Sequence, residues 1–492
     1  MAAHCFDATT FVGPCNHKAR GQHHNPPAPG RSHYLKIKRK QVCNKFFIGM
    51  KRIHTILIIL LLAVTYGEAK KSSDDRQMDD FITSLMKKMT LEEKIGQLNL
   101  GGVGSPKVVG SAIGLDEAIR KGLVSSVGGF DAKAAEDAQK FAVENSRMKI
   151  PLITGLDVVH GYYTIFPIPL ASACSWNMPL LEESARVAAD EASAFGINWT
   201  FAPMVDICRD PRWGRIAEGA GEDPCLGSRI GRAMVRGFQG DDLSKPNTLL
   251  ACVKHFALYG ASEAGRDYNT VSMDPVTMYN YYLPPYKAAF DEGAGSGMTS
   301  FNVVNGVPAT GNKWLLTDLL RDQWKFKGFM VSDANSLAEM SEHGMGGAQR
   351  ITELAMNAGL DMDMSSSLYV LCLKKAVEEK RVPLSRIDAA CRRVLEAKYK
   401  LGLFEDPFRY LKNKQRQSQV LSPQNRDVAR RLAAESIVLL KNSEQLLPIT
   451  PPRKIAVVGP MGNVRGELLG TWSYGYSKDK MHSAYEALRE AL

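Results

Sequence analysis

Eight short apolar runs with strand character recur along this chain of 492 residues, and helical segments lie between most of them. Segments 180–195, 276–290 and 351–358 repeat apolar residues at three-to-four spacing, which is typical of amphipathic helices. Strands that alternate with helices indicate βαβ units and a parallel sheet. Eight such units predict a closed (β/α)8 barrel, with a doubly wound open sheet as the alternative. The eight runs are 95–98, 124–127, 152–156, 199–205, 249–253, 297–303, 328–331 and 359–362.

Phosphate-binding loops are missing from the places where such a fold would carry them. No Gly-rich loop follows the first run, so the sequence gives no support to nucleotide binding. A phosphate-binding barrel would carry Gly-rich loops after the seventh and eighth strands. Those strands lead instead into SDANSLAEM (332–340) and DMSSSL (363–368). A phosphate-binding barrel enzyme is therefore set aside.

Polar and charged residues stand where the predicted strands end. The seventh run stops at Ser332 and Asp333, which places a lone carboxylate at a strand tip. A barrel gathers such tips around one pocket, where barrel enzymes carry out their chemistry. The ordinary structural interpretation is that Asp333 caps the next helix. The other residues in or just after predicted strands are Asp157, His160, Asp206, Lys254, His255, Phe301, Asn302, Asp361 and Asp363.

Taken singly, most of these residues also have a structural interpretation. His160 is typical of a hydrogen-bonded structural histidine, Asp206 and Asp361 of loop-orienting carboxylates, and Trp213 of loop packing. Their convergence at one end of a predicted barrel favours a functional pocket.

Six motifs occur in order along most of the chain. They are GLDVVHG (155–161), APMVDICRDPRWGRIAEGAGEDP (202–224), VKHFALYG (253–260), SFNVVNGVPAT (300–310), RDQWKFKGFMVSD (321–333) and LAAESIVLLKNSEQLLPI (432–449). At these residues the chain closely resembles glycoside hydrolase family 3, the β-glucosidase family, over roughly residues 78–492. The resemblance implies a retaining glycosidase. Six ordered motifs carry far more weight than any one of them.

The resemblance also implies roles for individual residues. Asp333 matches the catalytic nucleophile, and Asp157 matches the carboxylate that holds sugar hydroxyls in the −1 subsite. Arg215, Lys254 and His255 match the cationic and imidazole groups that grip the same sugar.

Two positions depart from the family pattern. Phe301 stands where many members carry Tyr, and Ala334 stands where many carry Trp. Both departures bear on the walls of the subsites, and therefore on sugar preference.

The residue types fit glycosidase chemistry without the family name. Sugar hydroxyls pair with carboxylate acceptors and with Lys or Arg donors. A retaining mechanism needs one carboxylate to attack the anomeric carbon and a second group, ~5–5.5 Å away, to protonate the leaving oxygen. Lys254 and Arg215 are expected to favour the ionised form of Asp333. The histidines after the N-terminal region show no metal-ligand spacing and no C-x-x-C is present, so neither a metal nor another cofactor is predicted.

The N-terminal region does not resemble the rest of the chain. Residues 1–49 are unpatterned and rich in His and Pro, and are interpreted as a spurious extension. Residues 50–69 have a basic start, a short apolar run and small residues at Gly67 and Ala69, which predicts a signal peptide cut after Ala69. The apolar run is too short for a transmembrane helix. We therefore expect a periplasmic or secreted protein without an integral membrane span, and an uncleaved anchor is the alternative.

The net charge of +10 is concentrated in that region. Residues 1–69 hold ten Lys and Arg against two Asp and Glu, which leaves the remainder near +2. The basic balance is therefore no argument for nucleic-acid binding.

The sequence also predicts how the chain is divided. A catalytic barrel is predicted over 70–405, a linker and helix over 406–453 with the helix at 426–440, and an incomplete α/β sandwich domain over 454–492 that opens with a strand at 454–459. The resemblance places the acid/base Glu in that second domain, beyond the residues present here. Of the six cysteines after Met50, Cys208 and Cys225 flank the Arg-rich loop and form the first candidate disulfide.

The predicted function is an exo-acting β-glycosidase that hydrolyses terminal β-D-glucosyl residues of oligosaccharides or glucosides. A β-xylosidase of the same family is the nearest alternative. The N-acetylglucosaminidase branch carries a KHFPGHG string, whereas this chain has KHFALYG (254–260). A truncated, non-catalytic sugar-binding remnant is the alternative from another class, and turnover of an aryl glycoside would separate it from an enzyme.

Overall fold

The computed structural model describes residues 73–492 except 102–113, 129–131, 413, 450–453 and 476–477. Residues 74–492 form one compact unit. The predicted extension at 1–49 and the predicted signal peptide at 50–69 lie outside the described residues. Among the described helices, none has the length and apolar character needed to cross a membrane.

Eight parallel strands form one sheet in the order β10-β1-β2-β3-β4-β5-β6-β9. A parallel bridge between Val331 and Met362 joins the two ends of this order, so the sheet closes on itself. This confirms the predicted (β/α)8 barrel. The strands are β1 (Asn99–Gly101), β2 (Ser126–Gly128), β3 (Ile153–Leu156), β4 (Trp199–Thr200), β5 (Leu250–Phe256), β6 (Ser296–Thr299), β9 (Phe329–Val331) and β10 (Asp363–Met364), and a small hairpin pairs β7 (Val303–Val304) with β8 (Val307–Pro308).

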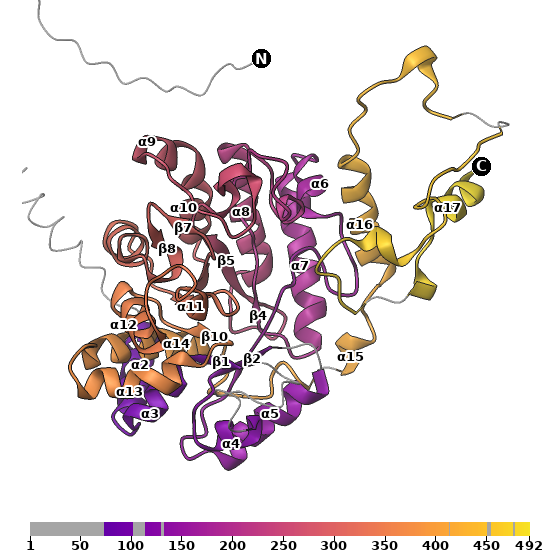
Figure 1. The fold of residues 1–492 in the computed structure, drawn as a ribbon. Helices are drawn as coiled ribbons and strands as arrows, with labels where there is room; N and C mark the ends of the chain where they lie inside the picture. Colours follow the sequence, from indigo (N-terminus) through magenta and orange to yellow (C-terminus); the bar gives the residue numbers. More distant parts are fainter. Residues whose placement is uncertain (1–72, 102–113, 129–131, 413, 450–453, 476–477) are drawn as a thin grey trace, which may run out of the picture. The chain divides into compact units, whose positions relative to one another are not determined.

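Helices surround the barrel (Figure 1). The predicted helix at 180–195 is α7 (Met178–Ala194), and the predicted helix at 351–358 lies within α12 (Ala348–Ala358). The segment 276–290 is helical but divided into α9 (Pro275–Thr277), a π-helical turn η4 (Met278–Tyr282) and α10 (Pro284–Asp291). The remaining α-helices are α2 (Ser73–Met86), α3 (Leu91–Gly96), α4 (Leu115–Arg120), α5 (Ala132–Asn145), α6 (Pro169–Ala173), α8 (Pro224–Gln239), α11 (Ser336–Glu339), α13 (Leu368–Glu378), α14 (Leu384–Lys400), α15 (Lys414–Gln417), α16 (Pro423–Glu435) and α17 (Ala484–Ala491).

Local signals in the sequence account for the position of α7 and its close packing against α8. The side chain of Asn177 accepts a hydrogen bond from the backbone N–H of Leu180 and so caps the helix N-terminus. Gly237 of α8 faces α7, and a Cβ there would lie 2.4 Å from the carbonyl oxygen of Glu182. Only glycine therefore allows the two helices to approach this closely.

The barrel interior is filled with large side chains. Trp199 of β4 is fully buried, and its ring lies edge-on to Phe201 at 4.8 Å and to Phe329 at 5.1 Å. Its indole N–H donates to the Ser296 hydroxyl at 2.8 Å, so the one polar atom of the ring is satisfied. The interior is thus a packed core that holds the strand tips in fixed positions.

Two predicted barrel strands are displaced along the chain. The run 95–98 is wrong as a strand because Leu91–Gly96 forms helix α3, which a capping box between Thr90 and Glu93 starts. Strand β1 begins only at Asn99. The last strand lies at 363–364 rather than at 359–362.

The predictions for the C-terminal region are also corrected. The helix expected at 426–440 ends at Glu435, and the following Ile437–Leu440 run is exposed. The expected strand at 454–459 is not formed, and Val458 is 84% exposed. A strand needs a neighbour for its backbone hydrogen bonds, and in the described part of the chain no strand follows β10.

The candidate disulfide is not formed. Cys208 is buried with a free thiol, and Cys225 is exposed with a free thiol. The two cysteines flank the same loop in the sequence, but the fold does not join their sulfur atoms in a disulfide.

Candidate active site

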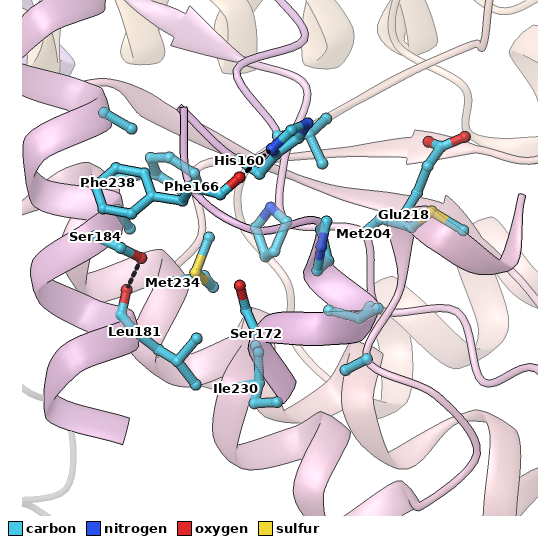
Figure 2. A pocket seen from close by; sticks show the side chains of 18 of the residues that line it. His160, Phe166, Ser172, Leu181, Ser184, Met204, Glu218, Ile230, Met234 and Phe238 are labelled. Carbon is cyan, nitrogen blue, oxygen red and sulfur yellow. Dashed lines mark hydrogen bonds between the residues drawn. The ribbon is translucent and has the colours of Figure 1, made fainter. Parts of the chain in front are cut away.

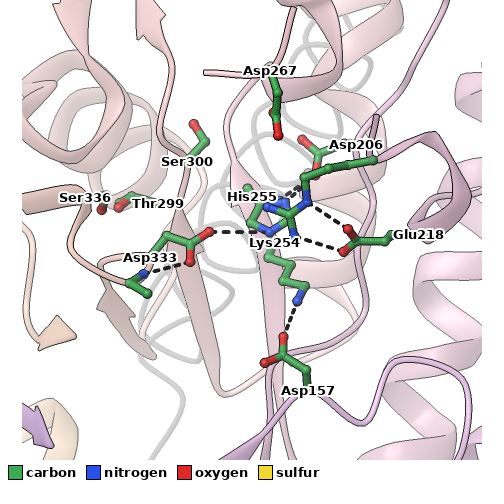
Figure 3. Close-up of polar contacts among 12 residues, drawn as sticks. Asp157, Asp206, Glu218, Lys254, His255, Asp267, Thr299, Ser300, Asp333 and Ser336 are labelled. Carbon is green, nitrogen blue, oxygen red and sulfur yellow. Dashed lines mark hydrogen bonds and ion pairs between the residues drawn. The ribbon is translucent and has the colours of Figure 1, made fainter. Parts of the chain in front are cut away.

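All six predicted site residues are among the described residues. They lie at strand ends and in loops at one end of the barrel. Asp157 directly follows β3, Lys254 and His255 lie near the end of β5, and Asp333 lies two residues after β9. Figure 3 shows these side chains converging from separate strands on one polar cluster. Arg215 comes from the long loop after β4, and Phe301 lies two residues beyond the end of β6.

Two ion pairs organise the cluster. The Lys254 ammonium lies 2.5 Å from Oδ1 of Asp157, and both side chains are largely buried. The Arg215 guanidinium donates two hydrogen bonds to Glu218, at 2.8 and 2.9 Å. Such a bidentate pair fixes the plane of the guanidinium. Both cations are therefore oriented before any ligand arrives.

Asp333 has one satisfied and one unsatisfied carboxylate oxygen. Its Oδ1 accepts a hydrogen bond from the backbone N–H of Ala334 at 2.7 Å. Its Oδ2 is buried, has no hydrogen-bond partner within the described residues, and lies 3.5 Å from Nε2 of His255. An unpartnered buried carboxylate oxygen at a strand tip is costly unless a ligand uses it.

Burial dominates the ionisation of Asp333. Desolvation raises the pKa of this carboxyl to about 7, although Arg215 and Lys254 act in the opposite direction. The sequence predicted that the two cations would favour the charged form. They do lower the pKa, but their effect is smaller than that of burial.

His255 is fully buried behind the cluster. Burial lowers the pKa of His255 well below its usual value, and the charges of Arg215 and Lys254 lower it further. Its Nδ1 lies 2.9 Å from Oδ2 of Asp206. The imidazole is therefore neutral at pH 7 and is held by a carboxylate on its far side.

Aromatic rings wall the cluster on one side. Tyr259 is fully buried, lies edge-on to His255 at 5.3 Å, and has the Arg215 guanidinium 5.5 Å from its ring centre. Phe301 is buried and packs against Tyr259 at 5.7 Å and against the half-exposed Tyr268 at 4.8 Å. Trp213, read from the sequence as loop packing, is buried against Tyr259.

Two residues close to this cluster were missed in the sequence. Glu218 lies in the RIAEG string (215–219), but the sequence does not show that it is the partner of Arg215, so it was not predicted as a site residue. Burial opposes ionisation of Glu218, yet the hydrogen bonds from Arg215 and the charge of Lys254 outweigh it and hold the pKa below its ordinary value. Trp472 comes from the C-terminal segment, and its ring centre lies 5.2 Å from the Lys254 ammonium.

His160 connects that segment to the barrel. Its Nδ1 lies 2.8 Å from the carbonyl oxygen of Phe166, and its Nε2 lies 2.5 Å from the carbonyl oxygen of Thr471. The structural interpretation of His160 thus agrees with its contacts. No pattern in the barrel sequence announces this contact, because its partners are 311 residues apart.

A separate, mainly apolar cavity of about 40 Å³ lies among α6, α7 and α8 (Figure 2). His160 and Glu218 line one side of it, whereas Phe238, Met234 and Leu181 line the rest. Ligand pockets for drug-sized molecules usually measure about 300–1,000 Å³. This cavity is too small for a sugar ring, and of the residues in the polar cluster only Glu218 lines it.

The polar cluster has the parts needed to bind a hydroxylated ring and attack it. It contains two carboxylate–cation pairs, Asp157 with Lys254 and Glu218 with Arg215, together with the unpartnered Oδ2 of Asp333.

Comparisons with known proteins agree with this geometry. Residues 90–397 match the sequence profile of the glycosyl hydrolase family 3 N terminal domain. The chain is 42% identical over 404 residues to the periplasmic beta-glucosidase of Salmonella typhimurium, and the match covers 80% of this chain and 52% of that protein. It is 32% identical to a putative beta-xylosidase of Formosa agariphila, over 81% of this chain and 56% of that protein.

A solved structure shows the same fold. The beta-glucosidase of Listeria innocua, crystallised with isofagomine, superposes with a TM-score of 0.79 at 41% sequence identity. The superposition covers 84% of this chain and 58% of that one. The chain spans about half the length of the curated relatives it matches. Profile, identity and fold agree, and the chain belongs to glycoside hydrolase family 3.

Proposed function

We propose that this chain is the catalytic barrel of a retaining exo-β-glycosidase that acts on terminal β-D-glucosyl residues of oligosaccharides or glucosides. The observation that carries the proposal is Oδ2 of Asp333, which is buried at a strand tip and has no partner among the described residues. It lies beside Arg215 and Lys254, whose charges stabilise the carboxylate when it ionises. The similarity to the Salmonella and Listeria β-glucosidases supports the choice of glucose.

In the proposed mechanism, the ionised Asp333 attacks the anomeric carbon, the bond from that carbon to the leaving-group oxygen breaks, and the departing group carries away the electron pair. Water then hydrolyses the resulting glycosyl ester and restores the Asp333 carboxylate. Asp157, Lys254 and Arg215 bind the sugar hydroxyls through charge-assisted hydrogen bonds. His255 and Phe301 complete the −1 subsite. An acid must protonate ordinary leaving groups, whereas dinitrophenolate leaves unprotonated. A dinitrophenyl glycoside therefore isolates the step that Asp333 performs.

The test is covalent trapping. A 2-deoxy-2-fluoro-glucosyl fluoride should add one fluorosugar to the peptide that contains Asp333, as read by peptide mass spectrometry. Asp333→Asn should remove this label. The control Glu353→Gln alters a buried carboxyl of α12 that pairs with Arg381 and should leave labelling intact. A label on any other residue would show that the nucleophile is misassigned.

A β-xylosidase is the second candidate, and it is favoured by the similarity to the Formosa protein. Glucose and xylose differ by the hydroxymethyl group on C5. Dinitrophenyl glucoside and dinitrophenyl xyloside compared under identical conditions will rank the two. A higher kcat/KM for the xyloside would reverse the proposed preference.

The location of the protein is a further part of the proposal. We infer export to the periplasm or beyond, because the signal-like pattern begins at Met50 and a relative is named as periplasmic. Expression from Met50 should yield an exported chain whose N-terminus lies close to Lys70. A cytoplasmic chain that keeps residues 50–69 would contradict this inference.

A further inference from the structure

Asp206 lies behind His255, where no sugar can touch it. Its carboxylate is fully buried and lies in the loop that follows β4. It faces three polar groups: the backbone N–H of His255 at 2.8 Å, Nδ1 of His255 at 2.9 Å, and the hydroxyl of Tyr286 at short range. A carboxylate that binds both the backbone and the ring of one histidine fixes that residue's position and orientation.

The geometry also determines which nitrogen of His255 carries the proton. The backbone N–H can only donate, and it donates to Oδ2 of Asp206. The same oxygen faces Nδ1 of the ring. If Nδ1 carries the proton, it donates a hydrogen bond to Oδ2, whereas an unprotonated Nδ1 would point its lone pair at an acceptor oxygen.

Protonation of Asp206 does not change this assignment. Burial raises the pKa of Asp206 to about 6, and the proton it gains goes to the other oxygen, Oδ1, next to the Tyr286 hydroxyl. That hydroxyl also lies 2.8 Å from the carbonyl oxygen of His255, so it can turn its own proton there. In both ionisation states, Oδ2 remains an acceptor for Nδ1–H.

The other ring nitrogen is then a bare lone pair. Nε2 of His255 lies 3.5 Å from Oδ2 of Asp333, and neither atom has a hydrogen-bond partner in the described part of the chain. When Asp333 is ionised, the two atoms are buried acceptors that face each other, and a group that brings a proton stabilises them. A sugar hydroxyl is such a group.

We propose that Asp206 is a positioning residue that holds His255 in the Nδ1–H tautomer, so that a bare Nε2 beside Asp333 accepts a hydrogen bond from a substrate hydroxyl. The assignment of that hydroxyl to a sugar rests on the proposed function. Without Asp206, the preferred tautomer reverses and Nε2–H donates to Oδ2 of Asp333. The bond would stabilise the carboxylate, lower its pKa and weaken it as a nucleophile.

The first experiment reads the tautomer directly. Two-bond proton–nitrogen NMR correlations on the full chain with ¹⁵N-labelled histidine distinguish the two tautomers, and His255→Gln assigns the signal. The wild type and Asp206→Asn should show Nδ1–H, because the amide oxygen of Asn can replace Oδ2 while its NH2 group faces Tyr286. Asp206→Ala should show Nε2–H. An Nε2–H signal in the wild type, or an unchanged tautomer in Asp206→Ala, overturns the proposal.

The second experiment measures kcat/KM for dinitrophenyl β-glucoside against pH. Asp206→Ala should lose about 10- to 100-fold, by analogy with the loss when a group that orients a metal-bound histidine is removed. Its acid limb should move to lower pH relative to the wild type, because Asp333 gains a donor. Arg215, Lys254, Asp157 and Tyr268 also act on Asp333, and all four are unchanged in this variant.

Asp206→Asn should recover most of the lost activity, because it keeps the acceptor that the tautomer needs. The control Glu353→Ala removes a buried carboxyl of α12 that pairs with Arg381, and it should lower only the melting temperature. If Asp206→Asn is as impaired as Asp206→Ala, the charge rather than the tautomer is essential and the proposal is wrong. A wild type without turnover counts against the proposed function alone, since the NMR result still decides the role of Asp206.

Discussion

Lys254 and Asp157 form a buried ion pair with 2.5 Å between Nζ and Oδ1, although 97 residues separate them in the chain. The pair joins the end of β5 to the loop after β3. Each charge satisfies the other, and each has further hydrogen-bonding capacity. The polar cluster is thus preorganised by its own charges.

The first prediction concerns this pair. Lys254→Ala and Asp157→Ala should each lower kcat/KM for dinitrophenyl glucoside by about ten- to hundredfold, since hydrogen bonds to charged groups contribute roughly 1.5–3 kcal/mol. The double variant should lose less than the product of the two single effects, because the residues act as a unit. Wild-type kinetics in both single variants would place the sugar elsewhere.

The second prediction concerns stability and Asp333. A carboxyl whose pKa rises to about 7 on folding binds more protons in the folded state between pH 4 and 7, so its ionisation makes stability fall as pH rises through that window. Asp333→Asn should therefore be more stable than the wild type at pH 8, by up to about 4 kcal/mol. Urea unfolding at pH 4 and pH 8 measures the difference, which should nearly vanish at pH 4. If Asp333→Asn changes stability equally at pH 4 and pH 8, burial does not raise the pKa of Asp333 as described.

The third prediction concerns Lys398 of α14, which is fully buried and donates to Oε1 of Gln97 at 2.7 Å. Burial lowers the pKa of Lys398 to about 7, so the unfolded state binds more protons between pH 7 and 10 and stability rises with pH there. Lys398→Met should stabilise the protein at pH 7 by about 1–4 kcal/mol.

This gain should shrink as the pH approaches 10. Lys400→Met, at an exposed position on the same helix, is the control and should change little at either pH. Destabilisation by Lys398→Met at pH 7 would mean that the bond to Gln97 outweighs the cost of burying the amine.

The fourth prediction concerns thiol reactivity. Cys174 and Cys225 are exposed and unpaired and should be alkylated rapidly in the native protein. Cys252 and Cys391 are buried, and burial raises the pKa of each thiol to about 12, so both should react only after unfolding. Peptide mass spectrometry after differential alkylation tests both statements. A Cys208–Cys225 disulfide peptide would restore the pairing suggested by the sequence.

The fifth prediction concerns the apolar run that follows α16. Val438 and Leu440 are 56% and 91% exposed, and their neighbours Ile437 and Leu439 are exposed as well. Such a run promotes association. Lys substitutions at Val438 and Leu440 should reduce light scattering and dye binding, whereas Ser443→Lys should not. If the variant with Lys at positions 438 and 440 aggregates as much as the wild type, another surface causes the aggregation.

Much of the architecture follows from the sequence alone. Strands and helices have different periods of apolar residues, so their alternation can be recognised in the sequence. Eight strand–helix units favour a closed barrel. Asp157, Lys254 and Asp333 could be placed at one end of the barrel because parallel strands share a direction. The run 95–98 failed because a short apolar stretch fits either a strand or a helix, and the capping box at Thr90 decided for the helix.

Only the tertiary structure decided the chemistry of the polar cluster. The sequence shows that Arg215 and Lys254 are charged, but not that burial of Asp333 outweighs them and raises its pKa to about 7. It shows Asp206 and His255, but not that one oxygen of Asp206 serves both the ring and the backbone of His255. The contact of Trp472 with Lys254 joins remote segments in the same way. Desolvation and orientation depend on which groups the fold brings together, and local patterns record only neighbours along the chain.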